Sequence, residues 1–287
     1  MNREQLKHTI HGQYGKLKKN ARKILPAFDA EVIHQFRVSY KKSRAFSRMI
    51  SVENGKDRQI KIPGKLKKIY HVLGSIRDLF LQQQRTLEAS REDQHTPQSY
   101  LNLLQQEIER LKSILSEILL KKPFYKSKKK LDALIPDEFT DVAFKEYMKN
   151  KWVAISAIIS SENFSDTTIH TIRKNLKDLF YNLKIFRPGD NDTVSALLWN
   201  GKDEPYFTTL LDDLGNFQDK SMAIALIKPG WIKSLHILDR QQLERIKKQW
   251  MKEKALVKKS LLNKLHVDFA QAAGSPLPTS RQPGPPG

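Results

Sequence analysis

Apolar side chains recur every three or four residues along most of the chain, the spacing of one face of an α-helix. The clearest run lies between residues 97 and 122, with Leu101, Leu104, Ile108, Leu111, Leu115 and Ile118. Such patterns predict helices at about 1–25, 30–52, 65–91, 97–122, 138–160, 166–187, 205–227 and 239–266, with a short apolar helix at 193–199. Alternating apolar and polar runs, which indicate strands, are almost absent. The pattern therefore predicts an all-α protein.

The ends of the predicted helices carry the residues that commonly cap or stop helices. Asp29 is expected to cap the helix at 30–52, and Thr96 the helix at 97–122, with Pro97 at its first position. Pro26 is expected to stop the first helix, because a proline breaks the backbone hydrogen-bond pattern.

A polar, basic connector around residues 121–136 separates the first four predicted helices from the rest. We therefore place the boundary between two halves there, at 1–135 and 136–268. The remaining residues, 269–287, are rich in proline and glycine and are predicted to be disordered.

The predicted helix at 30–52 has two opposite faces. One face is apolar and includes Phe36 and Phe46. At about 100° per residue, the other face carries a row of basic side chains within roughly 80° of arc: His34, Arg37, Lys41, Arg44 and Arg48. The row is about 21 Å long at roughly 1.5 Å per residue, and like charges at this spacing destabilise a helix. It therefore favours an extended anion, although a solvated basic face is the alternative.

Two motifs of the first half recur in the second half. The motif His34-x-x-Arg37-x-x-x-Lys41 returns 136 residues later as His170-x-x-Arg173-x-x-x-Lys177, and Lys184 matches Arg48 at the same offset. The segment from Leu73-Gly74 to Asp78 returns at an offset of 141 as the segment from Leu214-Gly215 to Asp219. Because order and spacing are both kept, the sequence predicts a duplicated four-helix unit. Phe180 stands at the position of Arg44 and Gln218 at that of Arg77, so the first half is expected to dominate binding.

The chain is strongly basic, with 51 Lys and Arg against 31 Asp and Glu and a net charge of +20. This charge indicates an anionic partner such as nucleic acid, a membrane surface or another polyanion. The lack of cysteine excludes disulfides and thiolate sites. No signal peptide and no membrane span is visible, so a cytoplasmic protein is expected. The motifs GxxxxGK[ST], GxSxG and HExxH are absent, so neither an enzyme nor a cofactor is predicted.

The two His-x-x-Arg-x-x-x-Lys helices, the Phe180-Tyr181 step and the two Leu-Gly-x-x-x-Asp segments resemble the CHAD family, the conserved histidine α-helical domain. The resemblance extends to about residue 268. It implies two four-helix bundles related by a pseudo-twofold axis, which bind inorganic polyphosphate in a basic central groove, and an association with polyphosphate granules. No Glu-x-Glu-x-Lys signature of a CYTH-type triphosphatase stands near the N-terminus, so a stand-alone module is expected.

The predicted polyphosphate-binding residues combine the two motif helices with neighbouring basic positions. They are Lys18, Arg22, His34, Arg37, Lys41, Arg44, Arg48, Lys67, His71, Arg77, His170, Arg173, Lys177 and Lys184. If the histidines titrate near their usual pKa of about 6.5, binding should tighten toward pH 6. Buried structural histidines are the alternative, and a metal site is disfavoured because the neighbouring cations repel a metal ion.

Supporting roles are predicted for the residues of the Leu-Gly-x-x-x-Asp segments. Gly74 is expected to mark a close helix crossing, because glycine is otherwise unfavourable inside a helix. Asp78 is expected to pair with Arg37 or Arg77, and Asp219 with Arg173. A nucleic-acid-binding helical protein remains the alternative function, because a charge of +20 serves it equally well.

Overall fold

The computed structural model describes residues 1–54, 59–91, 95–121, 124, 131–186 and 203–273. Throughout this part the chain is helical and contains no strand, which confirms the all-α class; Asn2 and Glu138 form an isolated bridge. None of the described helices is both long and apolar enough to cross a membrane. The predicted helix at 193–199, half of the basic connector and the tail from 274 lie outside the described residues.

The helices match the predicted ones to within a few residues at most ends. They are α1 (Arg3–Ala27), α2 (Ala30–Ile50), α3 (Gly64–Ala89), α4 (Gln98–Leu120), α6 (Asp141–Ser160), α7 (Asp166–Phe186), α9 (Glu204–Leu226), α10 (Pro229–Lys233) and α11 (Ile237–Ala273). The short helix α10 was not expected, and α11 continues past the predicted end at 266, so the first residues of the predicted tail are helical.

The predicted cap of α2 is confirmed, whereas the predicted stop of α1 is wrong by one residue. The Asp29 side chain accepts a hydrogen bond of 2.9 Å from the Val32 backbone N–H. Pro26 lies inside the last turn of α1, where its missing N–H removes only one helical hydrogen bond. The helix ends at Ala27 and is capped by Phe28, which lies in the left-handed region (φ 50°) and donates its backbone N–H to the Ile24 carbonyl.

The expected local cap of α4 is replaced by a residue from α11. The helix begins at Gln98, with Pro97 at the cap position and no capping side chain of its own. The buried Asp239 instead accepts a hydrogen bond of 2.7 Å from the Ser99 backbone N–H through Oδ2. Its Oδ1 lies 2.5 Å from His95 Nε2. The start of α4 is therefore stabilised by a tertiary contact, which a local sequence pattern does not reveal.

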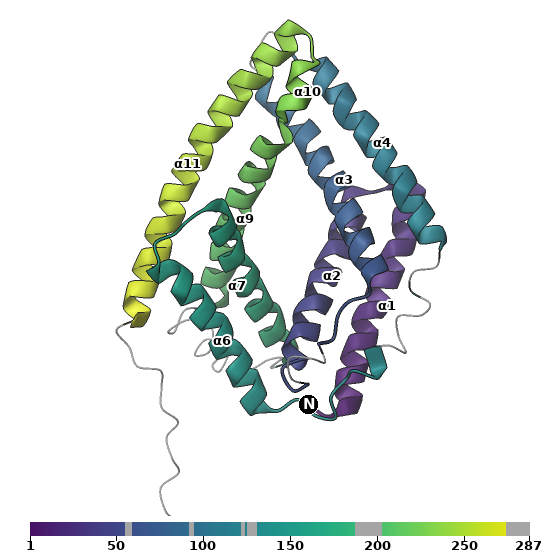
Figure 1. Cartoon of the computed structure of the whole chain (residues 1–287), viewed down its shortest axis with the longest axis vertical. Helices are drawn as coiled ribbons and strands as arrows, with labels where there is room; N and C mark the ends of the chain where they lie inside the picture. The colour runs from purple at the N-terminus through teal and green to yellow at the C-terminus, as the bar shows by residue number, and fades with distance from the viewer. Residues whose placement is uncertain (55–58, 92–94, 122–123, 125–130, 187–202, 274–287) are drawn as a thin grey trace, which may run out of the picture.

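The four helices that carry the repeated motifs form the inner part of the molecule. Figure 1 shows α2, α3, α7 and α9 as the inner sides of a diamond, and α1, α4, α6 and α11 along its outer sides. Helix α2 contacts α7, and α3 contacts α9, so the two halves of the chain meet through the motif helices. This arrangement positions the basic faces of α2 and α7 next to each other.

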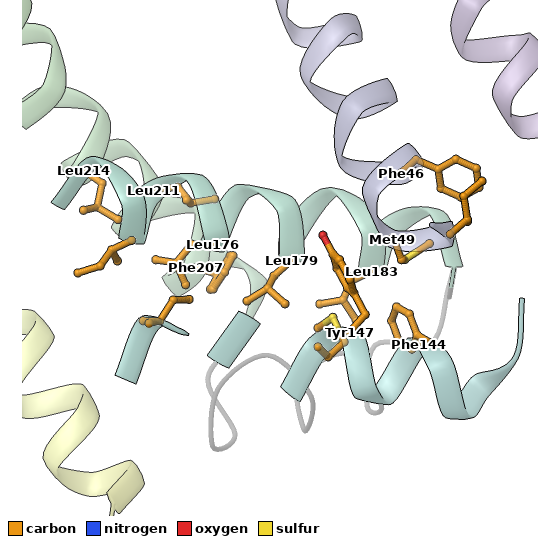
Figure 2. Close-up of a cluster of buried hydrophobic side chains, with 14 of the residues drawn as sticks. Phe46, Met49, Phe144, Tyr147, Leu176, Leu179, Leu183, Phe207, Leu211 and Leu214 are labelled. Carbon is orange, nitrogen blue, oxygen red and sulfur yellow. The ribbon is translucent and has the colours of Figure 1, made fainter. Parts of the chain in front are cut away.

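The buried apolar side chains form two clusters, and each draws on both halves of the chain. One cluster joins the start of α1 and the end of α2 to α6, α7, the start of α9 and the end of α11. In Figure 2, Phe46 and Met49 of α2 reach the same cluster as Phe144, Tyr147 and Leu183. The other joins the rest of α1 and α2 to α3, α4, the end of α9, α10 and the start of α11. The division at 135/136 and the internal duplication remain predictions.

Candidate anion-binding site

Arg37 of α2 lies against Gly74 of α3. Its Nη1 donates a hydrogen bond of 3.1 Å to the Tyr70 carbonyl, and its guanidinium lies 4.7 Å from the centre of the Tyr70 ring. A Cβ atom at position 74 would clash with Nη1 of Arg37 and lie 2.9 Å from its Cζ. The glycine in the first Leu-Gly segment therefore leaves room for the motif arginine.

The second copy repeats this contact between α7 and α9. A Cβ atom at Gly215 would lie 3.3 Å from Nη2 and 3.7 Å from Nε of Arg173. At both glycines the nearest atoms outside the helix belong to an arginine side chain. Gly74 was expected to mark a close helix crossing, but the structure shows that it makes room for the Arg37 side chain. The contact between glycine and arginine is tighter at Gly74 than at Gly215.

Basic side chains from both halves come together where α2, α3 and α7 meet. We call this set the central basic cluster: His34, Arg37, Lys41, Arg44, Arg77, His170, Arg173, Lys174 and Lys177. Burial, followed by the charges of Lys177 and three arginines, lowers the pKa of Lys41 to about 7. Burial and the charge of Arg173 lower the pKa of Lys177 to about 8, against the opposing effect of Asp212 and Asp219. The two motif rows are therefore close enough to repel each other.

The three histidines of the predicted site have pKa values below the usual range. Burial is the largest cause in each case. Nearby cations add to it, first Arg77 for His34 and Lys67 for His71. A hydrogen bond with Gln218 acts in the opposite direction on His170. The sequence predicted that charged histidines tighten binding toward pH 6. Because the pKa values are lowered, this gain should appear at a lower pH.

Several buried polar atoms in the cluster have no hydrogen-bond partner among the described residues. They are Nε of Arg44, Nε of Arg173 and Nδ1 of His170. A buried donor without a partner costs about 1–3 kcal/mol, so an acceptor beside it is strongly favoured. The oxygens of an anion are suitable acceptors for the guanidinium N–H groups.

The predicted ion pairs of the two aspartates are wrong. Asp78 is half-buried, and within the described chain it forms no ion pair with Arg37 or Arg77. Burial raises its pKa, although both arginines act to lower it. Arg37 is already engaged by Tyr70. Asp219 pairs with Arg85, whose Nη2 lies 3.5 Å from Oδ2, rather than with Arg173.

Two of the predicted binding residues are held by carboxylates. Arg48 of α2 forms an ion pair of 3.0 Å with the buried Asp178 of α7, which Lys151 also approaches to 3.3 Å. Lys184 pairs with Glu204, and its Nζ lies 4.4 Å from the centre of the Phe180 ring. Both cations are therefore partly neutralised, and Arg48 links the two halves.

The remaining predicted residues are exposed and lie outside the central basic cluster. Lys67 and His71 are exposed on α3, and His71 is close enough to Arg37 and Arg44 for their charges to lower its pKa. Lys18 and Arg22 are exposed on α1. A neighbouring face of α1, with Lys16, Lys19 and Lys23, lies beside His34 instead.

One member of the cluster, Lys174, was not among the predicted residues. Burial and the charges of Arg48 and Arg44 lower its pKa, so it faces α2. It follows His170 by four residues and so shares its helical face, which is a signal that the sequence does contain. The repeat did not identify it, because Val38 occupies the equivalent position in the first half.

Comparisons with known proteins show the family and the fold. The family model described as CHAD domain matches residues 8–228, which is more than half of the chain. The crystal structure of the CHAD domain from the plant Ricinus communis superposes with a TM-score of 0.65 at 16% identity, covering 97% of this chain and 94% of that one. This likeness concerns the fold. No curated protein matches. Because the family model matches more than half of the residues, the chain belongs to the CHAD domain family.

Proposed function

We propose that the protein binds inorganic polyphosphate at the central basic cluster. The observation that carries the proposal is the convergence of cations from both halves, with two arginine Nε atoms buried and without partners. Arginine presents a planar fork that binds two phosphate oxygens at once, whereas lysine supplies a point charge. A linear anion with many phosphates can satisfy such a cluster along its length, as the CHAD resemblance implies.

The mutual repulsion within the cluster favours anion binding. Burial and neighbouring cations lower the pKa of Lys41 to about 7, so the charged form is unfavourable in the free protein. A phosphate chain beside Lys41 and Lys177 would supply opposite charges and stabilise their protonated forms. Binding should therefore be accompanied by proton uptake. Affinity should also fall steeply as salt increases, by analogy with the counterion release seen for nucleic acids.

The aromatic side chains at the cluster favour polyphosphate over single-stranded nucleic acid. Proteins that bind single strands commonly stack bases on exposed aromatic rings. Here the Tyr70 ring is stacked on Tyr40, with centroids 4.3 Å apart, and the Arg37 guanidinium lies over it. The ring is therefore already engaged by two side chains, and nucleic acid remains the second candidate.

Competition between the two polyanions tests the proposal. Long-chain polyphosphate labelled with a fluorophore is bound to the protein, and unlabelled polyphosphate, single-stranded DNA or duplex DNA is added at equal phosphate concentration. We expect polyphosphate to displace the label at much lower concentration than either nucleic acid. Equal or stronger displacement by nucleic acid would contradict the proposal.

We propose further that the protein binds the chain without cleaving it, as a cytoplasmic protein that associates with polyphosphate granules. Incubation with long-chain polyphosphate and Mg²⁺ should leave the chain length unchanged on a gel; shortening that requires the protein would show an enzyme. A fluorescently tagged protein should collect at granules in cells that contain them, and a diffuse signal would contradict that location.

A further inference from the structure

An open hollow lies between α1 and α2 beside the central basic cluster. Three lysines of α1 line it, namely Lys16, Lys19 and Lys23, opposite His34 and Ser39 of α2. The lysines extend over about 10 Å of helix at roughly 1.5 Å per residue. The hollow therefore has the basic lining and the length of a short stretch of anion-binding surface.

The charges at this hollow are not neutralised by the part of the protein that the structure describes. Lys19 and Lys23 are exposed, as is Lys16, and none of the three forms an ion pair with a described carboxylate. The charge continues toward α7, because Lys16 and Lys184 both lower the pKa of Lys42, after the larger effect of burial. The hollow is therefore one end of a basic surface that spans α1, α2 and α7.

His34 belongs both to the hollow and to the central basic cluster. It lines the hollow with the α1 lysines, and the charges of Arg77, Lys41 and Lys177 lower its pKa. The two basic regions are thus contiguous through one side chain. A chain bound at the cluster therefore meets the hollow at His34, where the Glu31 carboxylate is also close enough to raise the pKa of this histidine.

We propose that a long polyphosphate chain leaves the central basic cluster past His34 and continues along the hollow between α1 and α2, where Lys16, Lys19 and Lys23 bind it. The inference rests on the proposed function and extends it by naming a second contact region. It predicts that chain length matters, because a short chain is held by the cluster alone. Among the described residues the lining includes no phenylalanine, tyrosine or tryptophan, so the imidazole of His34 is the one ring there on which a nucleobase could stack.

The experiment compares two triple variants that remove the same charge. The test variant is Lys16→Ala, Lys19→Ala, Lys23→Ala. The control is Lys248→Ala, Lys252→Ala, Lys259→Ala, which removes three exposed lysines from α11, on an outer side of the molecule (Figure 1). Affinity for long-chain polyphosphate and for tripolyphosphate is measured by titration calorimetry at several salt concentrations, and circular dichroism checks that both variants remain helical.

We expect the test variant to bind long-chain polyphosphate about tenfold more weakly, as suits three solvent-exposed charge contacts, and to bind tripolyphosphate as the unmodified protein does. The slope of log affinity against log salt should become shallower by about two to three for the long chain. The control variant should change either affinity less than twofold.

Three results would overturn the inference while leaving the proposed function intact. They are unchanged long-chain affinity in the test variant, an equal loss for the long and the short chain, and an equal loss in the α11 control. If the unmodified protein bound neither chain, the proposed function itself would fail. The two failures are therefore distinguishable.

Discussion

Helices α2 and α7 contact each other, and they carry two pairs of positions that are equivalent in the repeat. One pair has opposite charges, and the other pair has like charges. On one side, Arg48 of α2 binds the buried Asp178 of α7 at 3.0 Å. On the other side, the equivalent positions at the offset of 136 are Lys184 and Lys42, and burial followed by the charges of Lys16 and Lys184 lowers the pKa of Lys42. One side of the crossing is thus joined by an ion pair, while on the other side Lys42 lies close to the like charges of Lys16 and Lys184. The two motif copies are therefore not equivalent in charge where α2 and α7 cross.

The same inequality appears at the aspartates of the two Leu-Gly-x-x-x-Asp segments. Asp219 of α9 pairs with Arg85, which reaches it from α3. At the offset of 141 the position equivalent to Arg85 is Leu226, which supplies no charge for Asp78. Burial accordingly raises the pKa of Asp78. One acidic position thus contributes to the contact between α3 and α9, and the other lies among the cluster's arginines without an ion pair.

The largest effect is expected at the side of the crossing that has the ion pair. Asp178→Ala leaves Arg48 and Lys151 without their shared acceptor. We expect the free energy of unfolding to fall by about 2–3 kcal/mol, less than for a fully buried pair because Arg48 is partly exposed. Urea unfolding followed by circular dichroism measures the change. Lys42→Ala, at the equivalent position of α2, should change stability by less than about 0.5 kcal/mol; similar losses in both variants would contradict this difference between the two sides of the crossing.

The next largest effect is expected on polyphosphate affinity, when Arg44 of the first half and Lys184 of the second half are replaced. Arg44 has a buried Nε without a partner, whereas Lys184 is paired with Glu204. We expect Arg44→Ala to weaken polyphosphate binding by about tenfold or more, from the loss of a charge-assisted hydrogen bond, and Lys184→Ala by less than twofold. Titration calorimetry measures both. A larger loss for Lys184→Ala would show that the second half contributes more than its ion pair suggests.

A smaller effect is expected when the two glycines are compared. Gly74→Ala displaces the Arg37 guanidinium, because the new Cβ would clash with Nη1, whereas Gly215→Ala leaves 3.3 Å to Arg173. Both variants should remain folded, since the side chain can move and alanine favours the helix by about 1 kcal/mol. We expect polyphosphate affinity to fall about fivefold in Gly74→Ala and less than twofold in Gly215→Ala. Equal affinities would mean that the position of Arg37 does not matter for binding.

The smallest effect is the pH dependence set by the equivalent lysines Lys41 and Lys177. Their pKa values of about 7 and 8 lie below the usual value, and a bound polyanion raises them. Binding should take up protons between pH 7 and 9, so affinity should fall as pH rises through this window. Calorimetry in two buffers of different ionisation enthalpy measures the uptake. Lys41→Arg, which no longer titrates there, should reduce it, and an unchanged uptake would exclude Lys41.

The same pKa values determine how the free protein responds to pH. Between pH 7 and about 10 the unfolded chain holds more protons on these lysines than the folded protein, so the free energy of unfolding should rise with pH. Bound polyphosphate should remove most of this dependence, because it restores the pKa values. Thermal unfolding with and without the anion, at several pH values, tests this directly.

The sequence predicted the features that depend on neighbouring residues and missed those that depend on distant ones. Apolar periodicity located the helices, and Asp29 capped α2 as expected. The cap of α4 was missed because its carboxylate, Asp239, lies far along the chain. Spacing within α2 placed Arg48 in the same basic row as Arg44. Only the packing of α2 against α7 shows that Arg48 forms an ion pair with Asp178. Repeat matching likewise omitted Lys174, whose equivalent position holds Val38.

The two apolar clusters have a consequence for how the chain folds during synthesis. Helix α11 contributes Leu243, Ile246 and Trp250 to one cluster and Leu261 and Leu265 to the other. Neither cluster is therefore complete until α11 has left the ribosome, and until then the apolar side chains that pack against α11 stay exposed. Because these contacts join residues far apart in sequence, we expect slow folding that benefits from chaperones. A chain truncated at residue 228, where the family match ends, should lack both closing surfaces and aggregate.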